Sequence, residues 1–380
     1  MKNNKKIQMV DLQAQYARLK NSIDLEIQKV LDSGQFINGP QVKEFTEHLK
    51  EFLKINHVIP VANGTDALQI SLQALDLPKG SEIIIPSFTY VATAEVAAHL
   101  GYKIKFVDVD SDLFTISPKS LKQAISKNTK AIMPVHLYGQ SAPMDEIMEI
   151  ANGADLKVIE DNAQAIGAEY CGKHHSGFAG SFGDFGTISF FPSKNLGGYG
   201  DGGAICCNNE KWAEKARMIA NHGQSKKYVH DILGVNSRLD TLQAAILLAK
   251  LPHLKEFISV RQKTANKYDE ILGELPKQIS IPKRASYSSH VFHQYTVKVK
   301  NGKRDYLKSQ LAKRNIPSMI YYPIALHQQK AYKNETVVGP LNNTENLCTE
   351  VLSLPIHSEM DTQTAQLIAE NVVQILKNNG

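Results

Sequence analysis

One lysine in the sequence stands in a setting that suits covalent chemistry. Lys194 follows Phe-Pro-Ser at 191–193 and precedes a loop with five glycines at 197–203. Two strand-like runs, 187–191 and 204–207, flank the loop. Glycines this dense indicate a backbone that turns sharply or lets another molecule approach closely. A solvated surface charge is the alternative reading of a loop lysine, so other parts of the chain must decide.

A carboxylate is expected at the edge of the same predicted sheet. Asp161 ends the apolar run 157–161, and ligands of open parallel sheets bind outside the carboxyl ends of the strands. A helix N-cap is the alternative role for this aspartate. Gln164, three residues later, fits either reading.

A third group of residues could hold an anion. Gly64 and Thr65 lead into a predicted helix that starts near Asp66, and the free N–H groups of a helix start favour phosphate. Ser189 lies on the strand before Lys194 and adds a hydroxyl at the same sheet edge. An ordinary helix cap is the alternative for the first motif.

Together these residues match what pyridoxal phosphate requires of a protein. Its aldehyde needs a lysine amine, its ring nitrogen needs a carboxylate, and its phosphate needs N–H and hydroxyl donors. Neither GxxxxGK[ST] nor GxGxxG follows a predicted strand, which argues against the other common phosphate-binding motifs. A metal site is not expected, because the adjacent His174 and His175 have no evident third ligand.

The elements that must position these groups alternate along the chain. Buried strands are expected at 82–86, 104–110, 131–137 and 157–161, with helices at 89–100, 117–125 and 144–152. This alternation predicts an α/β fold with a mostly parallel sheet. A large domain is expected over residues 1–260, with an N-terminal helical segment, and a smaller α+β domain over 261–380.

Composition excludes several classes of function. The chain has 380 residues, a formal net charge of +5 and interspersed charges, which does not favour nucleic acid. No apolar run approaches the roughly 18 residues of a membrane span, and the N-terminus does not resemble a signal peptide. The four cysteines form no CxxC pair, which fits a reduced cytoplasmic protein.

Ten motifs in order resemble the DegT/DnrJ/EryC1/StrS family of sugar aminotransferases, whose fold is that of aspartate aminotransferase. They are GQFINGP (34–40), NGTDAL (63–68), PSFTYVATA (86–94), PVHLYGQ (134–140), IEDNAQAIGA (159–168), SFFPSKNLGGYGDGGA (189–204), NHGQ (221–224), GVNSRLDTLQAAIL (234–247), YYPIALHQQKAY (321–332) and LSLPIH (352–357). Several read like the subgroup that aminates UDP-2-acetamido-2-deoxy-3-oxo-glucuronate.

The resemblance implies a role for each matching residue. It makes Lys194 the Schiff-base lysine and proton carrier, and Asp161 the partner of the pyridinium nitrogen. The other implied cofactor contacts are Gly64, Thr65 and Ser189 at the phosphate, Tyr90 on the ring face, Gln164 by the ring's 3-oxygen, and Asn236 at the phosphate of the neighbouring subunit. The active unit would then be a homodimer with shared active sites.

The same resemblance suggests residues for the substrate. Arg238, Tyr322 and His327 are expected at the sugar, and a carboxylate on it would suit the planar fork of an arginine. His327 and His357 could equally have packing roles. Tyr321-Tyr322-Pro323 replaces the His-Tyr-Pro typical of the subgroup, which leaves room for a neutral 3-keto sugar.

The expected activity is pyridoxal-phosphate-dependent transamination of a nucleotide-linked keto-sugar, with glutamate as the expected donor, in polysaccharide or amino-sugar biosynthesis. Two alternatives share the scaffold. A dehydratase would carry histidine in place of Lys194, and a non-catalytic cofactor-binding regulator would need an attached DNA-binding segment. Neither feature is evident in the sequence.

Overall fold

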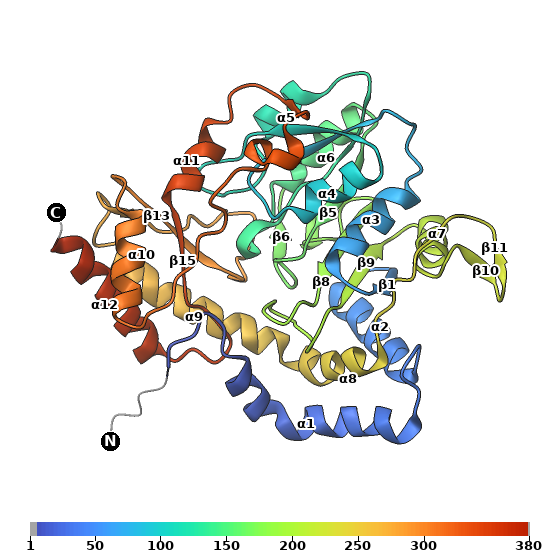
Figure 1. Ribbon diagram of the computed structural model, residues 1–380, viewed down its shortest axis with the longest axis horizontal. Coiled ribbons are helices and arrows are strands. Elements are labelled where there is room, and N and C mark those ends of the chain that lie inside the picture. The colour runs from blue at the N-terminus through green and yellow to red at the C-terminus, as the bar shows by residue number, and fades with distance from the viewer. Residues whose placement is uncertain (1–5, 379–380) are drawn as a thin grey trace.

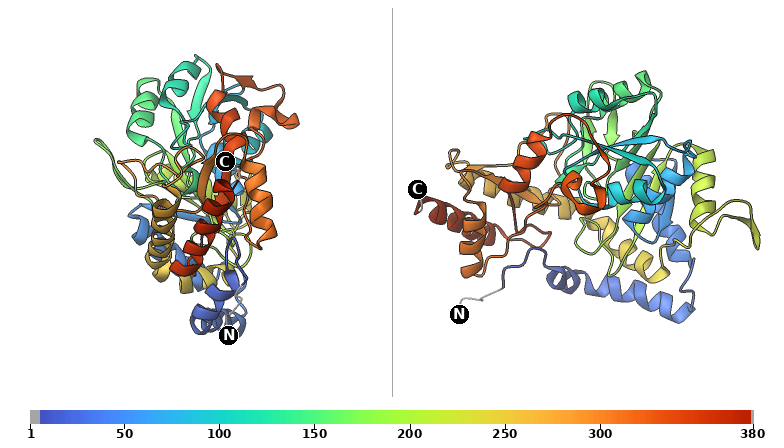
Figure 2. Two further views of the ribbon diagram at one scale, coloured as in Figure 1. Left: turned by 90° about the vertical axis from the view of Figure 1, so that its left-hand side faces the viewer. Right: turned by 45° about the horizontal axis from the view of Figure 1, so that its top comes forward.

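The computed structural model describes residues 6–378 of the chain. A large mixed sheet with helices on both faces forms the centre, and a small sheet lies at one end (Figures 1 and 2). The helices are α1 (Leu12–Ser33), α2 (Pro40–Leu53), α3 (Gly64–Ala74), α4 (Ala92–His99), α5 (Pro118–Ala124), α6 (Met144–Gly153), α7 (Glu210–Ala220), α8 (Thr241–Lys250), α9 (Leu254–Leu272), α10 (Arg304–Lys313), α11 (Asn342–Glu350) and α12 (Thr362–Lys377), with 3-10 turns η1 (Leu137–Gly139), η2 (Leu251–His253), η3 (Leu326–Gln328) and η4 (Lys330–Tyr332).

The large sheet has the strand order β1-β9-β8-β5-β4-β2-β3-β14. Its strands are β1 (His57–Val61), β2 (Glu82–Pro86), β3 (Lys103–Val107), β4 (Thr129–Ile132), β5 (Lys157–Asp161), β8 (Phe185–Ser189), β9 (Gly203–Cys207) and β14 (Thr336–Val337). Neighbours are parallel except at β9, which is antiparallel to both β1 and β8. The prediction of a mostly parallel sheet is therefore confirmed, and β2 and β5 have the predicted bounds.

Apolar runs bury the large sheet on both faces. Ile83, Ile84 and Ile85 of β2 have no exposed surface. Burial of each such side chain contributes roughly 1.5–3 kcal/mol relative to exposure. On one face α3, α4 and α7 contribute to the core; on the other, α2 and α8 form one core cluster with the sheet, and α5 and α6 form another. A sheet covered in this way leaves its strand ends as the place where a ligand can reach polar groups.

The smaller sheet is antiparallel and has the order β12-β13-β15. Its strands are β12 (Ile279–Ser280), β13 (Tyr295–Val299) and β15 (Val351–Leu354), and its core includes residues of α9, α10 and α12. Two hairpins complete the fold, β6 (Glu169–Cys171) with β7 (Ser176–Phe178), and β10 (Gln224–Lys226) with β11 (Val229–His230). Figure 1 shows the second hairpin projecting at the end of the molecule opposite the small sheet.

The division near residue 260 remains a proposal about domains. It falls inside α9, where Ile258 packs in the core of the large sheet and Ala265 in the core of the small one. The C-terminal part also returns to the large sheet, because β14 pairs with β3. Within residues 6–378, no helix combines the length and apolarity that crossing a lipid bilayer requires.

Candidate active site

A cavity of about 740 Å³ opens where β5 and β8 end and α3 begins. The lining includes eight residues that were predicted from the sequence: Gly64, Thr65, Tyr90, Asp161, Gln164, Ser189, Lys194 and Tyr322. They come from segments up to 258 residues apart in the chain, so the fold brings them together. This is the sheet edge that the strand pattern indicated for a ligand.

Lys194 is held by a loop with extensive support. Its backbone N–H donates to the carbonyl of Phe191 at 2.8 Å, and the amide of Asn195 donates to the carbonyl of Val291 at 3.0 Å. Further along the loop, the buried Lys250 donates to the carbonyl of Gly197 at 2.6 Å. Burial lowers the pKa of Lys194 to about 8, although the nearby charge of Asp161 opposes this shift. A larger share of neutral amine near neutral pH makes this lysine a better nucleophile.

Asp161 is a buried carboxylate at the end of β5. Its Oδ2 accepts a hydrogen bond from the hydroxyl of Thr93 at 2.7 Å, and its Oδ1 accepts one from the N–H of Ala163 at 3.1 Å. The Ala163 contact is a local turn and no helix directly follows β5, so the alternative role of Asp161 as a helix N-cap is wrong. Asp161 also lines the cavity, so the carboxylate can serve both the turn and a ligand.

Gln164 is oriented by two aromatic residues. Its Oε1 accepts from the backbone N–H of Tyr138 at 2.7 Å, and its Nε2 donates to the hydroxyl of Tyr322 at 3.2 Å. Burial raises the pKa of Tyr322, so its hydroxyl stays protonated and keeps its own hydrogen to donate. The Tyr322 ring also lies 6.2 Å from that of Tyr90, which is exposed at the cavity.

The start of α3 forms a close-fitting anion cradle. A Cβ added to Gly64 would lie 2.7 Å from Cβ of Ser189, so only glycine lets the helix start approach this serine. Asn63 caps the helix by accepting from the N–H of Asp66 at 2.8 Å. Asp66 in turn accepts from Ser237 at 2.6 Å, which fixes the helix against the segment that carries Asn236.

Four residues considered in the sequence lie outside the cavity lining of this chain. Asn236 is exposed, and Arg238 is half-buried. His327 bonds through Nδ1 with the hydroxyl of Ser87 at 2.7 Å and through Nε2 with Glu345 at 3.2 Å. His357 is buried and accepts at Nδ1 from the N–H of Glu359 at 3.2 Å. These contacts fit a packing role for both histidines, and a substrate role for His327 stays a prediction.

Several residues at the site were not predicted, and three of them are described here. Thr93 reaches Asp161 from α4, Tyr138 presents its N–H from η1, and His293 lines the cavity before β13. Thr93 and Tyr138 lie within motifs quoted above, but nothing in those motifs indicated which residues turn toward the site. His293 has no local pattern that separates it from an ordinary core histidine.

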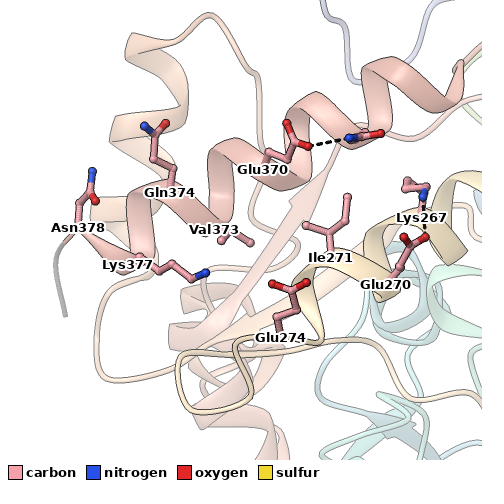
Figure 3. A pocket seen from close by; sticks show the side chains of 10 residues that line it. Lys267, Glu270, Ile271, Glu274, Glu370, Val373, Gln374, Lys377 and Asn378 are labelled. Atoms are coloured by element: carbon pink, nitrogen blue, oxygen red, sulfur yellow. Dashed lines mark hydrogen bonds and ion pairs between the residues drawn. The ribbon is translucent and has the colours of Figure 1, made fainter.

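A second hollow lies between α9 and α12 and shares no lining residue with this site (Figure 3). Its charged side chains include Glu270, which pairs with Lys267 at 2.6 Å, and Glu370, which accepts from Gln366 at 2.7 Å. Every residue that lines it is exposed or half-buried, so its polar groups are already solvated. Among residues 6–378, no three or more His, Cys, Asp or Glu side chains group as metal ligands.

The residues of the large cavity fit pyridoxal phosphate. The aldehyde of this cofactor requires an amine, and the cavity offers the desolvated amine of Lys194. The ring nitrogen requires a carboxylate, and Asp161 is a buried one. The phosphate requires hydrogen-bond donors, which the glycine-lined start of α3 and the hydroxyl of Ser189 can supply. The site and the α/β scaffold define a pyridoxal-phosphate-dependent enzyme.

Comparison with known proteins identifies the family. The model of the DegT/DnrJ/EryC1/StrS aminotransferase family matches residues 17–373, and this chain belongs to that family. It is 45% identical over 362 residues to a Pseudomonas aeruginosa protein named UDP-2-acetamido-2-deoxy-3-oxo-D-glucuronate aminotransferase, covering 95% of this chain and 98% of that protein. A Geobacillus stearothermophilus relative named pleiotropic regulatory protein is 42% identical over 374 residues, covering 98% of this chain and 99% of that protein.

Solved structures confirm the fold and the cofactor class. A Bacillus subtilis protein with bound cofactor PMP is 32% identical and superposes with a TM-score of 0.91, covering 99% of this chain and 87% of that one. Other relatives carry the names of UDP- and dTDP-sugar aminotransferases. The chain is therefore a pyridoxal-phosphate-dependent sugar aminotransferase.

Proposed function

We propose that this enzyme transfers an amino group from an amino acid, glutamate by expectation, to the ketone of a nucleotide-linked 3-keto-hexose, in the biosynthesis of amino sugars or surface polysaccharides. The observation that carries the proposal is the amine of Lys194, whose pKa burial lowers to about 8, in one cavity with Asp161 and the glycine-lined helix start. The names of the relatives support the substrate class.

Each site residue has a task in this proposal. Pyridoxal phosphate, when bound, supplies the electron sink for the carbon that loses a proton. Lys194 holds the cofactor and then carries the proton, while Asp161, oriented by Thr93, keeps the ring nitrogen protonated. Gly64, Thr65 and Ser189 would hold the phosphate. Tyr90 and Gln164 would contact the ring, and Tyr322 would contact the sugar.

Arg238 is the residue that we propose selects a negatively charged sugar. It is half-buried and two residues from Asn236, and it does not line the cavity of its own chain. It would therefore have to act on the site of a partner subunit, where its guanidinium could bind a uronic-acid carboxylate with two hydrogen bonds. The identity to the Pseudomonas aeruginosa relative supports a sugar of this kind.

A homodimer is part of the proposal, because Asn236 is exposed and outside the cavity lining of its own chain, where a second copy could receive it. Exposed apolar side chains near it in sequence, Tyr228 at 81% and Leu233 at 89%, suit burial in such an interface. We also propose a cytoplasmic location, which agrees with the four free cysteines.

The test is a panel of UDP- and dTDP-linked 3-keto sugars, each as a uronic acid and as its neutral analogue, with glutamate as donor. We expect turnover of at least one sugar, and none by Lys194→Ala. Binding of cofactor without turnover would favour a regulator, and release of water without amine transfer would favour a dehydratase.

Arg238→Lys tests the choice of sugar on the same panel. If Arg238 binds the carboxylate, the substitution lowers kcat/KM for the uronic acid by about 1–3 kcal/mol in transition-state free energy and spares the neutral analogue. Equal losses on both sugars would show that Arg238 has only a structural role.

A further inference from the structure

A buried imidazole closes the turn that follows β4 beside the active-site cavity. Nδ1 of His136 accepts a hydrogen bond from the N–H of Ala142 at 3.0 Å, so the ring spans residues 137–141. Tyr138 lies inside this turn and lines the cavity. Its backbone has φ 59° and ψ 0°, a left-handed conformation that a residue other than glycine keeps only when its surroundings hold it. The contact between His136 and Ala142 is one such hold.

Glu160 fixes the other side of this imidazole. Its Oε2 lies 2.8 Å from Nε2 of His136, and neither side chain has exposed surface. Three backbone N–H groups also donate to the carboxylate at 2.6–2.9 Å, from Gly180, Phe182 and Gly183. Because Nδ1 accepts from a backbone N–H, the hydrogen of the neutral ring is on Nε2, where it points at Glu160. The imidazole therefore has a partner at each nitrogen and one fixed orientation.

The clamped turn decides which end of Gln164 is available to a ligand. Oε1 of Gln164 accepts from the N–H of Tyr138 at 2.7 Å, and its Nε2 donates to the hydroxyl of Tyr322 at 3.2 Å. A hydroxyl can donate or accept, so the N–H of Tyr138 is the contact that fixes the direction of the amide. With Oε1 turned to the backbone, Nε2 keeps a second hydrogen for a ligand in the cavity that Gln164 lines.

We propose that His136, held by Glu160, is a positioning residue, which clamps the 137–141 turn so that Gln164 keeps its donor end toward the 3-oxygen of pyridoxal phosphate. The inference rests on the proposed contact of Gln164 with the cofactor ring. The backbone N–H of His136 also donates to the carbonyl of Asp161 at 3.0 Å, which fixes the start of the turn beside that carboxylate. A donor at the 3-oxygen stabilises its anionic form, so the clamp influences the acid–base behaviour of the bound cofactor.

The first test measures hydrogen exchange at the amides of Tyr138 and Ala142 in the full-length apoenzyme. In His136→Leu both amides should exchange about tenfold faster, while amides of the small sheet keep the wild-type rate. His136→Asn places an oxygen near the position of Nδ1 and should restore most of the protection. Residues 291 and 294 bond to the turn from its other side, so we expect it to loosen without unfolding.

The second test follows the absorbance of the bound cofactor across a pH series in the holoenzyme. Loss of a donor at the 3-oxygen disfavours the deprotonated form, so the midpoint should rise by about one pH unit in Gln164→Ala and by about half of that in His136→Leu. His136→Asn should stay near the wild type. In the double variant the midpoint should equal that of Gln164→Ala alone, because His136 acts through Gln164.

Two outcomes would overturn the proposal. One is an unchanged midpoint in a folded, cofactor-loaded His136→Leu protein. The other is a midpoint in the double variant above that of Gln164→Ala, since a general loss of stability would add to the first effect. Equal behaviour of the leucine and asparagine variants would also contradict the clamp, because only asparagine offers an acceptor to Ala142.

The premise has its own readouts. A holoenzyme without the cofactor's absorbance band, or with the cofactor mapped to a lysine other than Lys194 after borohydride reduction, would refute the proposed function. An unchanged midpoint in Gln164→Ala would refute the contact of Gln164 with the ring, and this inference with it, and would leave the assignment of Lys194 in place.

Hydrogen exchange of the wild type keeps the proposal testable if His136→Leu does not fold. A turn that the imidazole closes opens as one unit, so the amides of Tyr138 and Ala142 should share one opening free energy and respond alike to urea. An Ala142 amide that exchanges freely beside a protected Tyr138 amide would show that the turn does not depend on the imidazole.

Discussion

Thr93 shows how one hydroxyl supports the central carboxylate of the site. It donates to Asp161 at 2.7 Å in a buried setting, where a hydrogen bond to a charged group contributes about 1.5–3 kcal/mol. Without this bond the carboxylate of Asp161 would be less well oriented in the cavity. The contact therefore connects a side chain of α4 to the chemistry of the cofactor.

We expect Thr93→Val to lower kcat about tenfold or more, since 1.4 kcal/mol corresponds to a factor of ten. Thr93→Ser is the matched control, because it keeps the hydroxyl and should stay near the wild-type rate. Steady-state kinetics at full cofactor loading make the comparison. A valine variant with the wild-type kcat would show that Asp161 does not depend on this bond.

At the scale of single residues, the sequence predicted the reactive side chains better than the side chains that position them. Lys194 and Asp161 stand in recognisable local settings, a glycine-rich loop and a strand end. Thr93 acts through a contact with Asp161, 68 positions away in the chain, and no local pattern specifies such a contact. Asn236 and Arg238 were predicted only from family resemblance, and their roles stay predictions.

At the scale of elements, the start of α3 depends on a glycine. Gly64→Ala would place a Cβ 2.7 Å from Ser189 and push the helix start away from the serine hydroxyl. Because both groups are proposed to bind the phosphate, we expect the Kd for pyridoxal phosphate to rise about tenfold, or about 1.4 kcal/mol. Equilibrium dialysis of the cofactor measures this change.

Gly153→Ala provides the matched control for this substitution. Gly153 ends α6, and an added Cβ there would meet no atom within 4 Å. It should leave the cofactor affinity unchanged. If the two alanine variants bound cofactor equally well, the close approach of α3 to Ser189 would have no part in phosphate binding.

The C-terminus of α8 supports the lysine loop through a buried amine. Lys250 is 1% exposed, donates to Gly197 at 2.6 Å and lies 4.6 Å from the ring centroid of Tyr199. Burial lowers the pKa of Lys250 to about 7. Between about pH 7 and 10.5 the unfolded chain holds this proton and the folded chain does not, so this group makes the folded state more stable as the pH rises.

Lys250→Met should remove that pH dependence. From pH 7.5 to 9.5 we expect the free energy of unfolding of the wild type to increase by about 1–2 kcal/mol relative to the variant. Urea denaturation of the apoenzyme at both pH values measures the difference. Lys255→Met, at an exposed position of α9, is the control and should follow the wild type. Parallel curves for all three proteins would refute a buried neutral Lys250.

Periodicity predicted the long elements and missed the short ones. The runs at 82–86 and 157–161 became β2 and β5 with the same bounds, because continuous apolar residues suit a strand buried on both faces. The predicted strand 131–137 became β4, Thr129–Ile132, and the chain leaves the regular ladder before Pro134, which has no N–H to donate. β14 has two residues, too few for any period, and only its pairing with β3 defines it.

At the scale of the whole molecule, one chain accounts for most but not all of the proposed site. Asn236 is exposed and outside the cavity, although Ser237 beside it bonds to Asp66 at the cradle. If the active unit is a dimer, Asn236 completes the partner's site. Mixing Lys194→Ala with Asn236→Ala subunits should then restore up to one intact site per heterodimer.

The measurement is activity after the two variants are unfolded together and refolded, with heterodimers quantified by a tag on one subunit. Each variant refolded alone is the control and should stay inactive. Heterodimers that form and remain inactive would mean that Asn236 serves its own subunit or has no role at the cofactor.

The position of β9 also affects how the protein is made. In the large sheet β1 pairs only with β9, about 140–150 residues later in the chain, and β9 runs against the direction of its neighbours. At roughly 5–20 residues per second of translation, the apolar β1 leaves the ribosome about 7–30 s before its partner exists. During that interval β1 can pack against α2, the helix just before it in the chain, through apolar residues such as Phe45 and Leu49. Synthesis therefore leaves an open strand edge that a chaperone could shield.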